Sequence, residues 1–210
     1  FFLTALGFFR FRQNVDRPTS KLAGETHVLT AAADGERELR FADDHHATAS
    51  WTTQVAGFGN GTLDLVRLTT PATASAESAR GRIAACHAGS WFDPANSGHG
   101  LLLEVLGEPG ARQLAAIWYV YAGGRQQWLF GSGPVQGDRA QIALSTASGA
   151  NAPPLYDPGS VRIEPWGTLE FRAVDADRAV IDWSTTRAGF SSGNMALTRL
   201  TAIAGHACAD

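Results

Sequence analysis

The chain contains one lysine, Lys21, among 17 basic residues that face 20 acidic ones, and it has no basic run or stripe. Proteins that bind nucleic acid by neutralising phosphates need such a surface, so we expect no nucleic-acid partner. No apolar stretch approaches the roughly 18 residues of a membrane-spanning helix, so we expect no transmembrane segment. With 44% hydrophobic and 18% charged residues, the chain is too apolar to be disordered.

Cysteine is almost as scarce as lysine. The two cysteines, Cys86 and Cys208, have 121 residues between them, and neither belongs to a Cys-x-x-Cys or zinc-type spacing. We therefore expect no metal site and no cofactor. The two residues are either a disulfide pair or two unrelated buried thiols. In a barrel or sandwich with an even number of strands the first and last strands lie close together, which favours the disulfide and, with it, an exported protein in the periplasm, at the cell surface or outside the cell.

Helical periodicity is also missing, because no segment sustains it over three turns. Apolar and polar residues alternate instead in short segments, and turn signals recur every 8–12 residues. Because strands this close in sequence pair as antiparallel neighbours, we expect an all-β fold, an antiparallel meander that forms a barrel or a sandwich. The expected strands are 101–105, 113–121, 127–130, 139–144, 161–164, 168–173, 178–185 and 194–200, with one long irregular stretch at 145–160.

An internal repeat organises the chain. Residues 47–69 and 179–201 lie 132 positions apart and are identical at 11 of 23 positions. Leu39-Arg40-Phe41 also matches Leu169-Glu170-Phe171 if the turn that follows differs by two residues. This predicts a duplicated domain whose first copy is truncated at its N-terminus. We expect the C-terminal half of a first β repeat at 1–70, a small-residue linker at 71–84, and a complete β repeat at 85–210 that Cys86 and Cys208 close.

The start of the chain has two interpretations. Met195 is the sole methionine, so Phe1 does not begin a reading frame. The apolar run 1–9 is either the tail of a signal peptide or part of two short strands. The repeat favours the strands. We also expect the chain to be part of a longer tandem-repeat protein.

A second motif lies at the start of the complete copy. Residues 89–100 (GSWFDPANSGHG) resemble the opening motif of an uncharacterised, exported, bacterial β-rich repeat family, Gly-x-Trp-[Phe/Tyr]-[Asn/Asp]-Pro-x-x-Ser-Gly-x-Gly. The family's aromatic strand, glycine turn and Trp-Leu strand look like residues 117–121, 123–124 and 128–130, and its end looks like 189–190 and 199–201. The resemblance implies export and β architecture, and no activity. The opening is more distantly similar to the first strand of avidin-type barrels. A likeness at the level of the fold does not identify a ligand.

Six tryptophans and the opening motif supply the candidate ligand-binding residues. Aromatic rings stack on flat ligands, and we expect Trp118 and Trp128, which flank one hairpin, to share a face. In the motif, the polar residues form either a ligand-binding rim or only a tight turn, and we expect His99 to be solvated. The candidate ligand-binding residues are Trp118, Trp128, Trp91, Tyr119, Tyr121, Asp93, Asn96 and His99.

A serine-hydrolase pattern is also present, at residues 189–193 (GFSSG). The nucleophile elbow of such enzymes joins a strand to a helix, whereas strands flank this segment and the first copy has Gly59 at the nucleophile position. We therefore expect no catalytic residue and no enzyme. The leading hypothesis is a non-catalytic binding or adhesion module that recognises a glycan or another envelope component. The alternatives are a purely structural spacer and a barrel that binds a small hydrophobic ligand in the style of avidin or lipocalin.

Overall fold

The computed structural model describes residues 26–31, 35–54, 59–73, 78–96, 98–151, 155–203 and 205–209. Both interpretations of residues 1–9 lie outside these ranges. The chain divides into two compact units, Phe1–Leu68 with Gly149–Val161 and Thr69–Ser148 with Arg162–Asp210. Each unit is described by itself.

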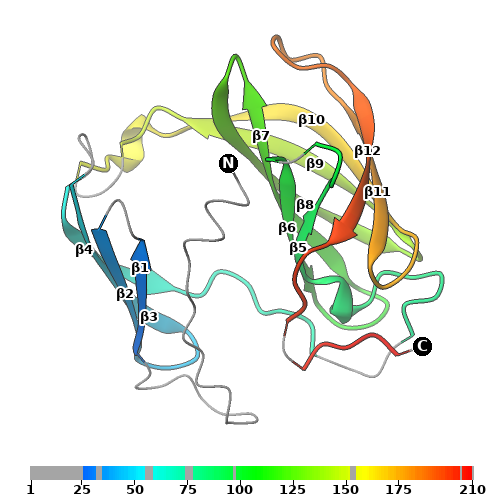
Figure 1. The fold of residues 1–210 in the computed structure, drawn as a ribbon, viewed down its shortest axis with the longest axis horizontal. Helices are drawn as coiled ribbons and strands as arrows, with labels where there is room; N and C mark the ends of the chain where they lie inside the picture. The colour runs from blue at the N-terminus through cyan, green and yellow to red at the C-terminus, as the bar shows by residue number, and fades with distance from the viewer. Residues whose placement is uncertain are drawn as a thin grey trace. The chain divides into compact units, whose positions relative to one another are not determined.

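The larger unit is a closed barrel of eight antiparallel strands (Figure 1). Every strand pairs with the next in chain order, and β12 pairs with β5 to close the ring. The expected all-β antiparallel meander is thus confirmed, as a barrel. The strands are β5 (Gly89–Phe92), β6 (Gly100–Leu106), β7 (Gln113–Ala122), β8 (Arg125–Gln136), β9 (Arg139–Ser148), β10 (Arg162–Ala173), β11 (Arg178–Ser184) and β12 (Gly193–Arg199).

The core of the barrel follows from the two-residue period of its strands. Along β7, Leu114, Ala116, Trp118 and Val120 are buried, while the residues between them face outward. Each large apolar side chain buried in this way contributes roughly 1.5–3 kcal/mol relative to exposure. Because outward residues of β7 are also apolar, this wall of the barrel has an apolar surface on both sides.

The two open ends of the barrel can be told apart by strand direction. The upper rim is the end of the barrel at which β5, β7, β9 and β11 terminate (Figure 1). The lower rim is the end at which these four strands start. The two strands expected at 161–164 and 168–173 are one strand, β10, interrupted by an irregularity in register between Pro165 and Gly167. Proline has no N–H to donate to a sheet, so it is tolerated at such a bulge.

The smaller unit contains a four-stranded antiparallel sheet in the order β1-β2-β3-β4. Two of its contacts recur 132 residues later in the barrel. The Trp51 indole N–H donates to the Gly59 carbonyl at 2.6 Å, and the Trp183 indole N–H donates to the Ser191 carbonyl at 2.7 Å. The strands are β1 (Thr26–Ala31), β2 (Gly35–Phe41), β3 (His46–Thr53) and β4 (Gly61–Val66).

The hairpin turn before each of these tryptophans is also built in the same way. Asp43 accepts hydrogen bonds from the backbone N–H groups of the residues two and three positions later, and so does Asp175. Phe41 pairs with Ala47, just as Ala173 pairs with Ala179. The expected two-residue difference between the turns is therefore wrong, because strand register aligns Phe41 with Ala173 and not with Phe171.

The segment expected to be a linker, 71–84, packs onto the barrel unit where the structure describes it. The Ala72 N–H donates to the Val105 carbonyl at 2.7 Å, and Pro71 forms a bridge with Leu106. Ala72 and Ile83 are buried in the barrel core. Small side chains allow the backbone to approach the strands closely, so the small-residue composition of this predicted linker also serves packing.

Candidate functional site

The outer face of β6, β7 and β8 carries a continuous group of apolar and aromatic side chains, which we call the aromatic strip. Strand register places Leu102 beside Ile117, and Ile117 beside Phe130. One step nearer the upper rim, Tyr119 lies directly opposite Trp128. Side chains paired in this way are within contact distance across antiparallel strands. The strip consists of Leu102, Ile117, Tyr119, Tyr121, Trp128 and Phe130.

Several members of the strip are open to solvent. Trp128 is 47% exposed, Leu102 is 42% exposed and Tyr121 is 37% exposed. The rings of Trp128 and Phe130 lie 5.2 Å apart and are inclined by 33°, so they form a shallow, gently tilted surface. Exposed aromatic side chains held on rigid strands offer contact area at little entropic cost, which makes this face suited to binding.

Tyr119 adds a polar group to the strip. Partial burial raises the pKa of its phenol above the ordinary value of 10.0. The hydroxyl is therefore neutral at physiological pH, and a neutral hydroxyl both donates and accepts hydrogen bonds.

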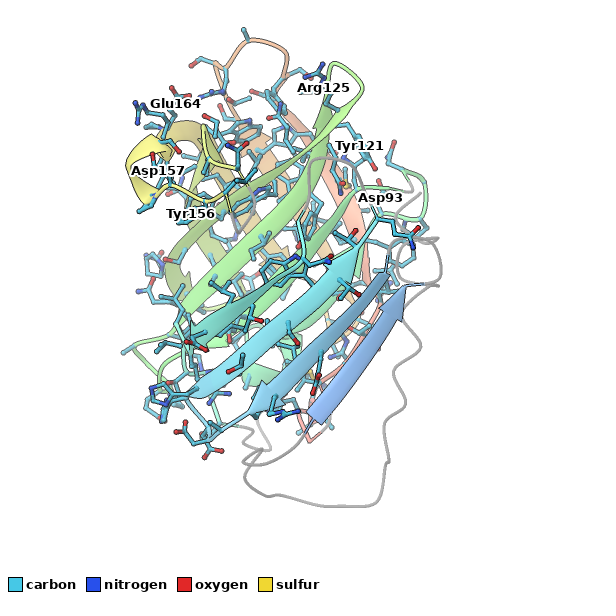
Figure 2. All side chains as sticks on the ribbon, turned by 90° about the vertical axis from the view of Figure 1, so that its left-hand side faces the viewer. Asp93, Tyr121, Arg125, Tyr156, Asp157 and Glu164 are labelled. Atoms are coloured by element: carbon cyan, nitrogen blue, oxygen red, sulfur yellow. A yellow bond between two sulfur atoms is a disulfide. The ribbon has the colours of Figure 1, made fainter. Side chains whose placement is uncertain are left out.

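The opening motif meets the strip at the upper rim, where Figure 2 labels Asp93 and Tyr121. The Asp93 carboxylate is buried and accepts hydrogen bonds from the Ala95 N–H at 2.8 Å and the Asn96 side-chain amide at 2.6 Å. Asp93 and Asn96 therefore hold a turn, as one of the two interpretations expected. His99 packs edge to face on Tyr121 with ring centroids 5.5 Å apart.

His99 is not the solvated residue that we expected. It is half-buried, and its Nδ1 atom is buried with no hydrogen-bond partner among the described residues. Gly98 beside it has φ +105°, and a Cβ there would lie 3.6 Å from the Tyr121 ring. The motif glycine thus permits a backbone conformation that brings His99 against the aromatic strip.

Two of the predicted site residues lie inside the barrel. Trp91 is 1% exposed, and its indole N–H donates to the His87 carbonyl at 2.9 Å. Trp118 is 2% exposed and packs edge to face on Trp166 and Trp183, at centroid distances of 5.7 and 5.0 Å. The expectation that Trp118 and Trp128 share a face is therefore wrong, because Trp118 points inward beside Leu129 while Trp128 points outward. Trp91 and Trp118 are core residues.

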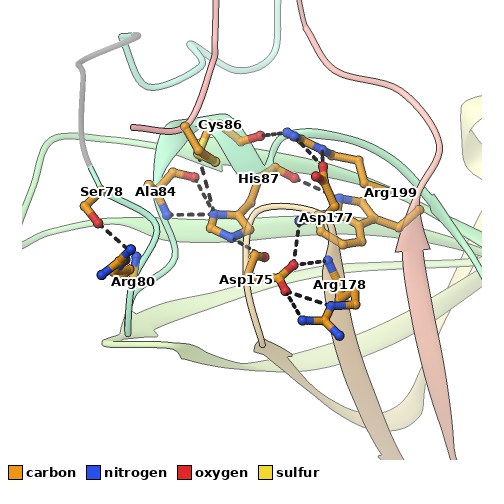
Figure 3. The surroundings of a disulfide bond; sticks show 11 residues. Ser78, Arg80, Ala84, Cys86, His87, Asp175, Asp177, Arg178 and Arg199 are labelled. Carbon is orange, nitrogen blue, oxygen red and sulfur yellow. Dashed lines mark hydrogen bonds and ion pairs between the residues drawn. A yellow bond between two sulfur atoms is a disulfide. The ribbon is translucent and has the colours of Figure 1, made fainter. Parts of the chain in front are cut away.

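The disulfide expected between Cys86 and Cys208 is present, with a Cα–Cα distance of 5.2 Å (Figure 3). It ties the C-terminal segment to a short 3-10 helix, η1 (Ala85–His87), at the lower rim. Ligand atoms of Cys86, His87 and Cys208 lie within 4.8 Å of one another. A disulfide offers no thiolate to a metal ion, so in this oxidised form the cluster is a covalent closure.

Charged and polar groups surround this closure in Figure 3. Arg199 donates to the Cys86 carbonyl at 2.6 Å and forms an ion pair with Asp177 at 2.7 Å. His87 is fully buried; its Nδ1 accepts from the Ala84 N–H at 3.0 Å, and its Nε2 lies 3.3 Å from the Asp175 carbonyl. The Nδ1 atom also lies 3.2 Å from the Ala84 carbonyl, and the bond from the Ala84 N–H is made by the neutral imidazole with its proton on Nε2.

Burial lowers the pKa of His87 below its ordinary value of 6.5, and the nearby charge of Arg199 lowers it further. The hydrogen bonds with Ala84 and Asp175 only partly oppose these two effects. The unfolded chain therefore binds a proton that the folded chain excludes. We expect the free energy of unfolding to be constant above about pH 6.5 and to fall below it, by up to about 1.4 kcal/mol per pH unit. Urea unfolding at pH 8, 6.5 and 5 measures this.

The matched variant for this prediction is His87→Gln, which cannot titrate. It should be less stable at pH 8 and should lose most of the slope below pH 6.5, whereas the exposed His45→Gln should keep it. An equal slope in the wild type and His87→Gln would show that other groups cause the acid sensitivity.

Comparison with protein-family models, curated proteins and solved structures gave no match. Neither of the short helices in the described part of the chain has the length and apolar character needed to cross a membrane.

Proposed function

We propose that this protein is a non-catalytic binding module of an exported protein and that its aromatic strip binds a glycan. The observation that carries the proposal is the 47% exposed Trp128, which lies opposite Tyr119 and packs against Phe130 on the outside of the barrel. An exposed aromatic strip, and not a featureless polar surface, distinguishes a binding module from a structural spacer.

Sugar rings suit this surface for chemical reasons. One face of a pyranose presents C–H groups, which pack on an indole ring, while its hydroxyls need hydrogen-bond partners at the edge. The Trp128 ring supplies the platform. Tyr121 and Gln126, which pair directly across the strands, supply a hydroxyl and an amide beside it. Rigid strands hold these groups before the ligand arrives.

Export and a tandem-repeat context form part of the same proposal. The Cys86–Cys208 disulfide supports export, because such bonds persist in oxidising compartments. The repeated tryptophan and turn contacts support duplication, with the four-stranded sheet as the C-terminal half of a first β repeat. The resemblance of the opening motif to an exported bacterial repeat family points in the same direction.

The alternative of a barrel that binds a small ligand in its interior has less support. At the upper rim, Trp118 packs on Trp166 and Trp183, and Phe190 packs on Trp166 at 5.2 Å. These four aromatic side chains converge where a ligand of that kind would enter. Their packing favours a filled barrel end, and the outer strip therefore offers the better binding surface.

The test is isothermal titration calorimetry of the whole chain against a panel of soluble glycans. Calorimetry does not depend on tryptophan fluorescence, so replacing Trp128 does not remove the signal. We expect at least one saturable ligand, and at least tenfold weaker binding in Trp128→Ala because the stacking platform is lost. Val174→Ala is the matched control, since Val174 is 49% exposed in the β10–β11 turn, away from the strip. No binding to any glycan, or equal binding by Trp128→Ala, would overturn the proposal.

A further inference from the structure

The strand pair β3–β4 of the smaller unit has the same backbone pairing as β11–β12 of the barrel. All six residue pairs between β3 and β4 recur 132 positions later between β11 and β12, without a shift in register. One backbone bond beyond β4, from the Arg67 N–H to the His45 carbonyl at 2.7 Å, recurs from Arg199 to Asp177 at 2.9 Å. What lies against β12 therefore indicates what β4 can bind.

The outer edge of β12 binds the opening motif. Residues 90–92 of β5 lie against this edge, where the Leu200 N–H donates to the Ser90 carbonyl at 2.7 Å. Trp91 projects from the same segment into the core, where it is 1% exposed and packs edge to face on Phe171 at 5.7 Å. This short strand is thus held by backbone pairing at the edge and by an indole ring in the core.

The corresponding edge of β4 is open. Among the described residues, β4 is the last strand of its sheet and β3 is the strand that pairs with it. Val66 is 71% exposed and Leu68 is 95% exposed. Because the Arg67 N–H points toward β3 and neighbouring residues of a strand point their N–H groups to opposite sides, those of Val66 and Leu68 point away from β3. An open edge of this kind is a template for another strand.

The apolar side chains of β4 are also more open to solvent than their counterparts in the barrel. Leu63 corresponds to Met195, and Leu65 corresponds to Leu197. Leu63 is 42% exposed and Leu65 is half-buried, whereas Met195 is 8% exposed and Leu197 is 2% exposed. Apolar side chains beside an open strand edge favour association with a further strand.

We propose that β4 is a docking surface for an extended segment that carries the opening motif and is supplied by a further repeat of this protein. The segment adds to the sheet as an antiparallel strand, as β5 does to β12, and accepts hydrogen bonds from the N–H groups of Val66 and Leu68. Its tryptophan packs against the apolar face that Leu63 and Leu65 form. The proposal rests on the duplication in the proposed function and not on the aromatic strip.

The test is fluorescence anisotropy of a labelled synthetic peptide with the sequence of residues 88–100, titrated with the whole chain. The principal variant is Val66→Pro/Leu68→Pro, because proline removes the two N–H groups that the docking strand needs, and an edge strand tolerates proline. The matched control is Val66→Ala/Leu68→Ala, which shortens the same two side chains and keeps both N–H groups. Circular dichroism checks that both double variants fold.

We expect saturable binding that the double proline variant weakens at least tenfold, through two lost hydrogen bonds, while the double alanine variant stays within about threefold of the wild type. Trp91→Ala in the peptide should also weaken binding at least tenfold, and this arm uses the unaltered protein. Absence of saturable binding, equal binding by the two double variants, or equal binding of the two peptides would overturn the proposal. Failure of the glycan titrations alone would leave it standing.

Discussion

Gly133→Ala is expected to destabilise the barrel by about 3 kcal/mol, because the added methyl group would overlap the neighbouring strand. A Cβ at Gly133 would lie 1.8 Å from the backbone oxygen of Gln141 and 2.7 Å from its carbonyl carbon. Both atoms belong to β9, so no side-chain rotation relieves the clash and the two strands must separate. Urea unfolding, followed by circular dichroism, measures the loss of stability.

Gly131→Ala should behave similarly, since its Cβ would lie 2.0 Å from the backbone oxygen of Ala143. Ser132→Ala, between the two glycines, is the matched control. Ser132 is exposed on the same strand, so this variant should remain within about 0.5 kcal/mol of the wild type. A Gly133→Ala protein as stable as Ser132→Ala would mean that β8 and β9 are not in the close approach described.

Loss of the disulfide is expected to have an effect at least as large. Cys86 and Cys208 are 122 positions apart, and closing a loop of that length restricts the unfolded chain strongly. The chain-entropy relation gives about 4–5 kcal/mol of stabilisation, a large share of the stability of an ordinary domain. We expect the Cys86→Ala/Cys208→Ala double variant to show a correspondingly lower urea midpoint at pH 7.

A reducing agent provides the control for this prediction. It should lower the urea midpoint of the wild-type protein and leave that of the double variant unchanged, because only the wild type has a disulfide to lose. A double variant within about 1 kcal/mol of the oxidised wild type would show that the described closure adds little to stability.

The fold could be predicted in outline because its signals are local. Alternating side chains and closely spaced turns define antiparallel neighbours in a meander, and that pattern recurs from β6 to β12. The pairing of Cys86 with Cys208 followed from the same idea, that the ends of a closed or folded meander lie together. The boundary between the two strands expected at 161–173 could not be predicted, because Pro165 and Gly167 are equally typical of a turn and of a bulge.

The candidate site could be predicted from the sequence only in part. Tyr119, Tyr121 and Trp128 were identified from aromatic content, and they do lie on one surface. Trp118 does not lie on this surface, because its side chain is buried inside the barrel. Both faces of β7 are apolar, with Leu114 and Ala116 on one side and Ile117 and Tyr119 on the other, so alternation alone cannot say which face is inside.

The sequence by itself determined the all-β class, the antiparallel meander, the recurrence 132 residues apart and the cysteine pair, since each depends on short-range pattern or on residue count. The tertiary structure decided which tryptophans are core and which are exposed, because ring closure gives the β7–β8 wall an inside and an outside.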